Sequence, residues 1–252
     1  LSGRTGVIVK NGRVIKFDAG VAIVGGSSNV VENLLVRDNI GTTKRGDFGD
    51  GITVSGSNGN LITDNDVIHN GPFDGIGLVG VSSGNFIEGN LVSENNLPQT
   101  GDDGIRIEGP GATYNTVRGN TVSGNTLDGI AVFSNQGTGP QNDANVIEDN
   151  TVTANGFGFL GARPGDGIRT FLRADSNTIR NNDVHDNAGS GLLIGSGSLK
   201  NQILTNTSTG NARRATAGTR FDLQDDNTSP PCDANFWSGN VYGTANQTCT
   251  TL

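Results

Sequence analysis

The sequence predicts an all-β protein, a single-stranded right-handed parallel β-helix of roughly seven to eight coils. Three observations predict this fold. An Asp-Gly-Ile motif returns along the chain, asparagines recur at five-residue steps between its copies, and short apolar alternations separate the asparagines. A repeat in which each unit contacts only its neighbours builds a solenoid. Its narrow core suits a chain with 33% hydrophobic and 5% aromatic residues.

The Asp-Gly-Ile motif marks one strand of each coil. Full copies begin at Asp50, Asp74, Asp103, Asp128 and Asp166, and degenerate copies begin at Ala19 and Ser190. The closest copies lie 24 residues apart, from position 50 to 74 and from 166 to 190. Longer intervals contain an inserted loop. The apolar residues of each copy alternate, as in Ile52 and Val54, so one face of the strand points into the core.

Three asparagines at five-residue steps follow one another between successive motifs, and this happens six times. The sets are Asn60/Asn65/Asn70, Asn85/Asn90/Asn95, Asn115/Asn120/Asn125, Asn145/Asn150/Asn155, Asn177/Asn182/Asn187 and Asn201/Asn206/Asn211. Asparagine tolerates the left-handed backbone conformation, so we expect these residues at tight corners. Stacked at one corner, each side-chain amide donates to one neighbour and accepts from another, which satisfies polar groups inside the solenoid.

The two ends of the chain break the repeat. We expect residues 1–221 to form the β-helix and residues 222–252 to form a C-terminal capping segment. Cys232 and Cys249 lie close together in that segment, and we expect them to form a disulfide, which suits a secreted or cell-surface protein. The chain begins almost directly with strand-like Val7-Ile8-Val9, without a recognisable cap, so we also expect an upstream domain.

Charge narrows the choice of partner. The chain has 17 basic and 25 acidic residues, a net charge of −8. Proteins that bind nucleic acid carry a basic footprint, so nucleic acid is not expected as a partner. No apolar run approaches the roughly 20 residues that a membrane-spanning helix needs, so membrane insertion is not expected either. An anionic polysaccharide would need calcium to bridge it to this acidic chain.

The asparagine steps and the Gly-Ile motif, across about residues 19–211, resemble the right-handed parallel β-helix repeat superfamily. That superfamily includes pectate lyases, polygalacturonases, alginate epimerases, copper-maturation β-helix proteins and non-catalytic carbohydrate-binding modules. The resemblance is highly specific for the fold and nearly silent on function. Because one fold hosts many functions, it does not choose among them.

The outward positions of the Asp-Gly-Ile strands carry a mixed set of side chains in the middle coils. They are Arg106, Glu108, Phe133, Arg169 and Phe171, with Asp128 and Asp166 along the edge of the same face. Aromatic rings stack on sugar rings, and guanidinium and carboxylate groups bind sugar hydroxyls. These residues therefore predict a polysaccharide-binding face. The alternative is that inserted loops cover the phenylalanines while the arginines neutralise the aspartates.

Gly101-Asp102-Asp103-Gly104 is the only corner with two adjacent carboxylates. Two nearby carboxylates push each other's pKa values apart, which supplies an acid and a base at one pH. The segment resembles the Gly-Asp-Asp motif of polygalacturonase-type inverting glycosidases. The resemblance implies Asp102 or Asp103 as the general acid, with Asp74 helping to activate water.

A lyase or epimerase is another interpretation of the same residues. Arg106 or Arg169 would then act as the base, with calcium held by Asp74, Asp102 or Asp103. A simpler interpretation is that each aspartate caps its own Asp-Gly turn by accepting backbone N–H bonds. Three functions stay open: polysaccharide binding, which we favour, a polysaccharide hydrolase or lyase, and a structural or adhesive surface protein.

Overall fold

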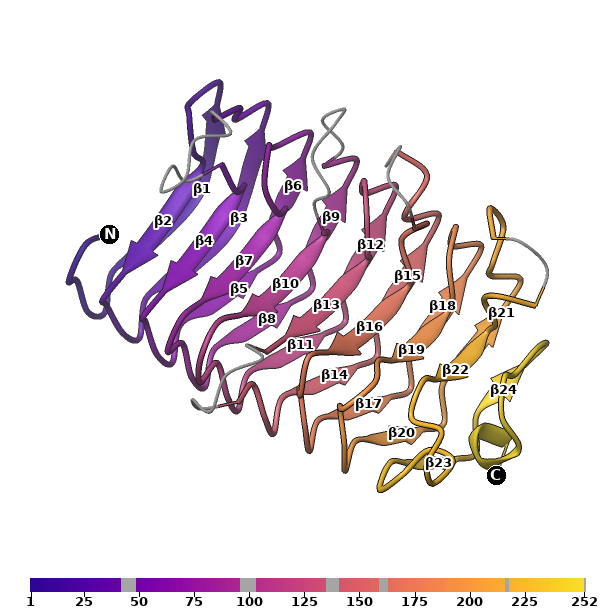
Figure 1. The fold of residues 1–252 in the computed structure, drawn as a ribbon. Coiled ribbons are helices and arrows are strands. Elements are labelled where there is room, and N and C mark those ends of the chain that lie inside the picture. The colour runs from indigo at the N-terminus through magenta and orange to yellow at the C-terminus, as the bar shows by residue number, and fades with distance from the viewer. Residues whose placement is uncertain (42–48, 96–102, 135–140, 159–162, 216–217, 252) are drawn as a thin grey trace.

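The computed structural model describes residues 1–41, 49–95, 103–134, 141–158, 163–215 and 218–251. In this part of the chain, 24 strands and one short 3-10 helix stack into a parallel β-helix, as Figure 1 shows. All the strand pairings are parallel, and successive coils follow one another along a single axis. The predicted fold class is confirmed. None of the helices in these residues is long and apolar enough to cross a membrane.

One face of the solenoid is an eight-stranded sheet built from the Asp-Gly-Ile strands. Its strands, in order, are β2 (Val21–Val24), β4 (Ile52–Ser55), β7 (Ile76–Val79), β10 (Ile105–Glu108), β13 (Ile130–Phe133), β16 (Ile168–Phe171), β19 (Leu192–Ile194) and β22 (Leu223–Asp225). The register places equivalent motif residues opposite each other, so that Ile105 lies between Ile76 and Ile130. This sheet carries the candidate site.

The other two faces belong to one sixteen-stranded sheet. Strands β1 (Ile8–Ile15) and β3 (Val30–Arg37) begin it at the N-terminal end. One face continues through β5 (Leu61–Thr63), β8 (Phe86–Glu88), β11 (Thr116–Arg118), β14 (Val146–Glu148), β17 (Thr178–Arg180), β20 (Gln202–Leu204) and β23 (Phe236–Ser238). The second continues through β6 (Asp66–Ile68), β9 (Leu91–Ser93), β12 (Thr121–Ser123), β15 (Thr151–Thr153), β18 (Asp183–His185), β21 (Thr207–Thr209) and β24 (Val241–Tyr242).

The core is a set of apolar columns that run along the axis. The central residue of each short strand points inward, and the predicted inward residues are buried, from Ile62 and Val67 to Ile179 and Val184. The motif strands contribute Ile52 and its equivalents in the same way. Because each coil buries its apolar side chains only against the coils above and below, the core is long and narrow.

The predicted asparagine ladders are confirmed, and Asn120 shows their geometry. Its Oδ1 accepts hydrogen bonds from the backbone N–H and the Nδ2 of Asn90, at 2.9 and 3.0 Å. Its own Nδ2 donates to Asn150 Oδ1 at 3.0 Å and to the Ile87 carbonyl at 2.9 Å. Each ladder amide therefore satisfies buried backbone as well as its neighbours in the ladder.

The predicted left-handed conformation of the ladder asparagines is wrong. The residue immediately before each asparagine adopts that conformation instead, for example Asp64 with φ 54°, His69 with φ 55° and Asp149 with φ 56°. A left-handed residue turns the chain sharply at the corner. The turn lets the following asparagine point its amide into the coil, where it reaches the amides of the neighbouring coils.

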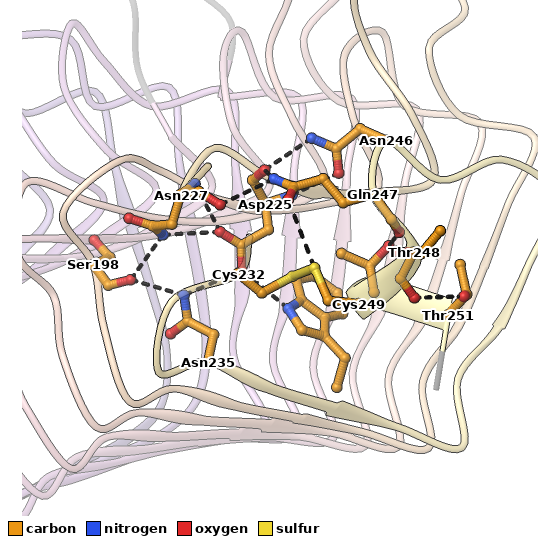
Figure 2. Close-up of a disulfide and its surroundings, with 12 residues drawn as sticks. Ser198, Asp225, Asn227, Cys232, Asn235, Asn246, Gln247, Thr248, Cys249 and Thr251 are labelled. Atoms are coloured by element: carbon orange, nitrogen blue, oxygen red, sulfur yellow. Dashed lines mark hydrogen bonds between the residues drawn. A yellow bond between two sulfur atoms is a disulfide. The ribbon is translucent and has the colours of Figure 1, made fainter. Parts of the chain in front are cut away.

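The C-terminal residues add one further coil and then close the end of the core. Strands β22, β23 and β24 pair with β19, β20 and β21. The predicted disulfide between Cys232 and Cys249 is present, with its Cα atoms 6.2 Å apart, and it ties the loop before β23 to the 3-10 helix η1 (Thr248–Thr251), as Figure 2 shows. The division between residues 1–221 and 222–252 stays a prediction.

Polar side chains end the core beside this disulfide. Asp225 is the last inward residue of the eight-stranded sheet, opposite Ile194, and it is fully buried. Its carboxylate accepts hydrogen bonds from Asn227, Asn235 and the indole of Trp237, at 2.8 to 3.1 Å (Figure 2). Burial raises the pKa of this carboxyl. A hydrogen-bonded carboxylate replaces an apolar residue at this end of the column.

Candidate functional site

The aspartates of the Asp-Gly-Ile motif form a buried column along one edge of the eight-stranded sheet. Oδ1 of each accepts the backbone N–H of the next: Asp50 from Asp74, Asp74 from Asp103, Asp103 from Asp128 and Asp128 from Asp166, at 2.7 to 3.0 Å. These five side chains are at most 7% exposed. The aspartates thus link neighbouring coils, whereas the sequence suggested that each capped its own turn.

The second carboxylate oxygens of this column face the outer side of the sheet. Thr53 donates to Asp50 Oδ2 at 2.5 Å. Arg106 Nη1 lies 3.6 Å from Asp103 Oδ2. These contacts use the outward position of each motif strand, so the column forms one border of the predicted binding face. Asp102, the other predicted member of the carboxylate pair, lies outside the described residues.

Arg163 neutralises the middle of the column, and sequence reasoning missed it. Its Nη1 and Nη2 bind the two oxygens of Asp128 at 2.9 and 2.8 Å, and Nη1 also reaches Asp166 Oδ2 at 3.2 Å. Arg220 approaches Asp166 from another loop, with its Nε 3.8 Å from Oδ1. Both arginines lie in insertions that interrupt the repeat, where periodicity carries no signal.

The carboxyl groups of the column differ in pKa. Burial, together with the nearby charge of Asp128, raises the pKa of Asp103 to about 7. Burial likewise raises the pKa of Asp50 and of Asp166 to about 6. Burial also acts on Asp128, but the charges of Arg163 and Arg169 outweigh it and hold the pKa of Asp128 below its usual value.

These shifts predict that the protein is more stable at pH 5 than at pH 8. In the unfolded chain Asp103 ionises near 3.8, but in the folded protein it holds its proton until about pH 7. The folded state therefore binds more protons between about pH 4 and pH 7, so stability falls as pH rises through this range and levels off above about pH 7. We expect a loss of at least about 2 kcal/mol, measured by urea unfolding. Asp103→Asn should flatten the profile, and stability that rises with pH would contradict the assignment.

Two phenylalanines stack on the outer face of the sheet. Phe133 and Phe171 lie opposite each other in register, with ring centroids 4.6 Å apart and ring planes tilted by 52°. The guanidinium of Arg106 lies 5.1 Å from the Phe133 centroid, and that of Arg169 lies 4.0 Å from the Phe171 centroid. Both phenylalanines are half-buried. The structure therefore brings together four of the residues that the sequence placed on this face.

Ala131, the first of the two outward residues of β13, is buried between two arginines. Ala131 lies between Arg106 and Arg169 in the register and is fully buried. A small residue here leaves room for the long arginine side chains on either side to cover it. Thr53 and Leu193, outward in the same column, are also buried. The exposed part of the face is therefore smaller than alternation alone predicts, and it centres on the phenylalanines and arginines.

Arg106 and Arg169 occupy equivalent positions in two Asp-Gly-Ile-Arg segments, but their partners differ. Arg106 Nη2 lies 2.6 Å from Glu108 Oε2. Arg169 has Phe171 where Arg106 has Glu108, and its nearest carboxylates, Asp128 and Asp166, are 3.8 and 4.0 Å away. The Nε atoms of both arginines are buried without a hydrogen-bond partner among the described residues.

Metal ligands are dispersed in the part of the chain that the structure describes. There, no group of three histidine, cysteine, aspartate or glutamate side chains is arranged to hold a metal ion. His69 lies 2.7 Å from Glu94, and His185 lies 3.1 Å from Asp186 on a distant coil. The oxygens of Asp103 that the calcium prediction used face a backbone N–H and Arg106.

The fold and this face together define a parallel β-helix protein with an arginine- and phenylalanine-bearing sheet. The sequence profile of the family described as periplasmic copper-binding protein (NosD) matches residues 1–169. The chain therefore belongs to the NosD family. No curated protein matches it by sequence.

Solved structures share the fold at low sequence identity. The periplasmic alginate epimerase AlgG has a TM-score of 0.66 at 17% identity, over 90% of this chain and 47% of that chain. The AlgE6 A-module, a mannuronan C-5 epimerase from Azotobacter vinelandii, has a TM-score of 0.54 at 16% identity, over 97% and 75%. Pectate lyase Pel9A has a TM-score of 0.55 at 13% identity, over 95% and 69%. This chain spans about half the length of AlgG.

Proposed function

We propose that this chain binds polysaccharide on the outer face of its eight-stranded sheet, outside the cytoplasm. The binding residues are Arg106, Phe133, Arg169 and Phe171, with Glu108 at the border. The stacked pair of half-buried phenylalanines carries the proposal. Their rings offer an apolar platform to a sugar ring, while the adjacent guanidinium groups offer hydrogen-bond donors to its substituents.

The local balance of charge also supports this face as a binding surface. Around Asp128 and Asp166, three arginines (Arg163, Arg169 and Arg220) approach two carboxylates. The net charge of −8 therefore does not describe this part of the sheet. A sugar chain that bears carboxylates meets no uncompensated negative charge there, so calcium is not required as a bridge at this position.

The comparisons support the class of ligand through the fold. AlgG and AlgE6 are named as epimerases of alginate and mannuronan, and Pel9A as a pectate lyase. Their identity to this chain is at most 17%, so residue roles do not transfer from them. The disulfide and the periplasmic description of NosD and AlgG support a location outside the cytoplasm.

Removing both rings should weaken polysaccharide binding without unfolding the protein. We expect Phe133→Ala/Phe171→Ala to lower affinity by at least about 10-fold, because each stacked ring contributes about 1 kcal/mol. The measurement is affinity electrophoresis on alginate, polygalacturonate and a neutral glucan, each with calcium and with a chelator. Phe86→Ala is the matched control, since this 45% exposed ring lies in β8 on the other sheet. Equal binding by the wild type and the double variant would contradict the proposal.

Catalysis at Asp103 is the second candidate function. The raised pKa of Asp103, about 7, and the guanidinium of Arg106 3.6 Å away favour it, because a general acid works best near its own pKa. The same assays distinguish the two functions. Release of unsaturated oligosaccharides by the wild type but not by Asp103→Asn would indicate a lyase, and new reducing ends alone would indicate a hydrolase. Binding without release by both proteins, and with the C5 configuration of the uronates unchanged in the recovered polymer, would leave polysaccharide binding as the function.

Copper, which the family description names, does not fit the residues of this chain. Copper sites in proteins use imidazole, thiolate and thioether ligands. This chain has no methionine, its two cysteines form the disulfide, and its two histidines lie on distant coils. These residues therefore offer no copper site. Calcium remains a proposal that the chelator arm of the binding assay tests.

A further inference from the structure

Two guanidinium groups compete for the same two carboxylates on the eight-stranded sheet. Asp128 and Asp166 are fully buried, so their charges need close partners. Arg163 occupies both, through contacts of 2.8, 2.9 and 3.2 Å. Arg169 faces the same carboxylates from the sheet itself, but its closest approaches are 3.8 and 4.0 Å.

Because Arg163 binds both carboxylates, Arg169 has no close carboxylate partner among the described residues. Its Nε is buried and unpaired, and no hydrogen bond of its guanidinium is found among the described residues. The guanidinium carbon lies over Phe171, 4.0 Å from the ring centroid, and 17% of the Arg169 side chain is exposed. A buried guanidinium with free donors gains strongly from an oxygen ligand.

The equivalent arginine one motif earlier shows a different outcome. Arg106 follows Asp103 at the same spacing as Arg169 follows Asp166, but Glu108 lies 2.6 Å from its guanidinium. The chain thus contains one Asp-Gly-Ile-Arg segment whose arginine has a close carboxylate partner and one whose arginine does not. The insertion that supplies Arg163 precedes only the second segment.

We propose that Arg163 is a positioning residue: it binds Asp128 and Asp166 so that Arg169 stays unpaired above Phe171 and available to an oxygen of the bound sugar chain. This inference rests on the proposed function, because the sugar chain is the ligand that Arg169 meets. Arg163 itself need not touch that ligand. Without Arg163, a movement of about 1 Å would bring Arg169 onto Asp128 and remove its donors from the face.

A labelling experiment without ligand tests the role of Arg163 directly. Phenylglyoxal reacts with available guanidinium groups, and mass spectrometry of the digest reports the modification of Arg169. In Arg163→Ala we expect several-fold slower modification of Arg169, because Asp128 then holds it. Modification of Arg169 at an unchanged or faster rate would overturn the proposal.

Binding assays on alginate and polygalacturonate supply the functional test. We expect Arg163→Ala and Arg169→Ala each to lower affinity by about 10-fold, and the double variant to lose no more than either, because both act through one contact. Arg163→Ala/Asp128→Asn/Asp166→Asn should recover most of the loss, since it removes both carboxylates that are free to capture Arg169 once Arg163 is gone. Additive losses, or no recovery, would overturn the proposal.

The design separates this inference from the proposed function and from misfolding. If the wild type binds neither polysaccharide, the proposed function fails, while the labelling result still decides the role of Arg163. Arg163→Ala removes the closest partner of two buried carboxylates and is the variant most at risk of misfolding. Arg163→Ala/Asp128→Asn/Asp166→Asn removes both carboxylates, and its Arg169 should be modified at a rate close to that of the wild type. Slow modification of Arg169 in this triple variant would overturn the proposal.

Discussion

Replacing Asn120 with alanine is expected to lower the free energy of unfolding by about 4 kcal/mol or more. Asn120 is 1% exposed and lies in the middle of its ladder. Its loss leaves two donors of Asn90 without their acceptor, and it removes the Nδ2 donor of the Ile87 carbonyl. Asn150 Oδ1 also loses that donor and keeps only the backbone N–H of residue 120. Each buried polar group left without a partner costs about 1 to 3 kcal/mol.

Urea unfolding measures this effect, and Asn58→Ala is the control. Asn58 is exposed, and its Oδ1 accepts one hydrogen bond, from the backbone N–H of Ser83 at 2.8 Å. Water can replace that bond, so we expect a loss below about 1 kcal/mol. Similar losses for the two variants would show that burial of the ladder amides is not what stabilises the coils.

Replacing Gly129 with alanine is expected to destabilise the protein by about 3 kcal/mol or more, because the interior has no room for a methyl group. A Cβ at this position would lie 2.4 Å from Val152 Cγ1, 2.7 Å from the Gly167 carbonyl oxygen and 2.8 Å from Asn155 Nδ2. Gly129 is not among the residues with positive φ. The glycine of the Asp-Gly-Ile motif is therefore required for space, although the dipeptide resembles a turn signal.

Gly158→Ala is the matched control for this substitution. Gly158 is exposed, also lacks a positive φ, and a Cβ there would lie 3.5 Å from Thr126, an ordinary contact. We expect its free energy of unfolding to stay within about 0.5 kcal/mol of the wild type. Thermal unfolding of both variants measures the difference. Equal stability of Gly129→Ala and Gly158→Ala would show that the neighbouring coils can shift to accommodate the methyl group without a loss of stability.

The repeat made the fold and much of the outer face predictable. The five-residue step of the asparagines predicts that Asn120 stacks on Asn90 in the neighbouring coil. The alternation of apolar residues in the motif strands then predicts that Phe133 and Arg169 point outward. Local geometry shared by all coils is what sequence periodicity reports. The disulfide was also predictable, because it joins two cysteines within one short segment.

By itself, the sequence determined the stacking of coils, the inward columns and most of the residues on the outer face that we propose for binding. The tertiary structure alone decided which carboxylate each arginine contacts, that the aspartates link neighbouring coils, and that the residue before each asparagine turns the corner. Arg163 belongs to an insertion without periodicity, so its approach to Asp128, 35 residues earlier, depends on the path of the loop in space. Contacts between an inserted loop and the coils depend on distances that no repeating pattern specifies.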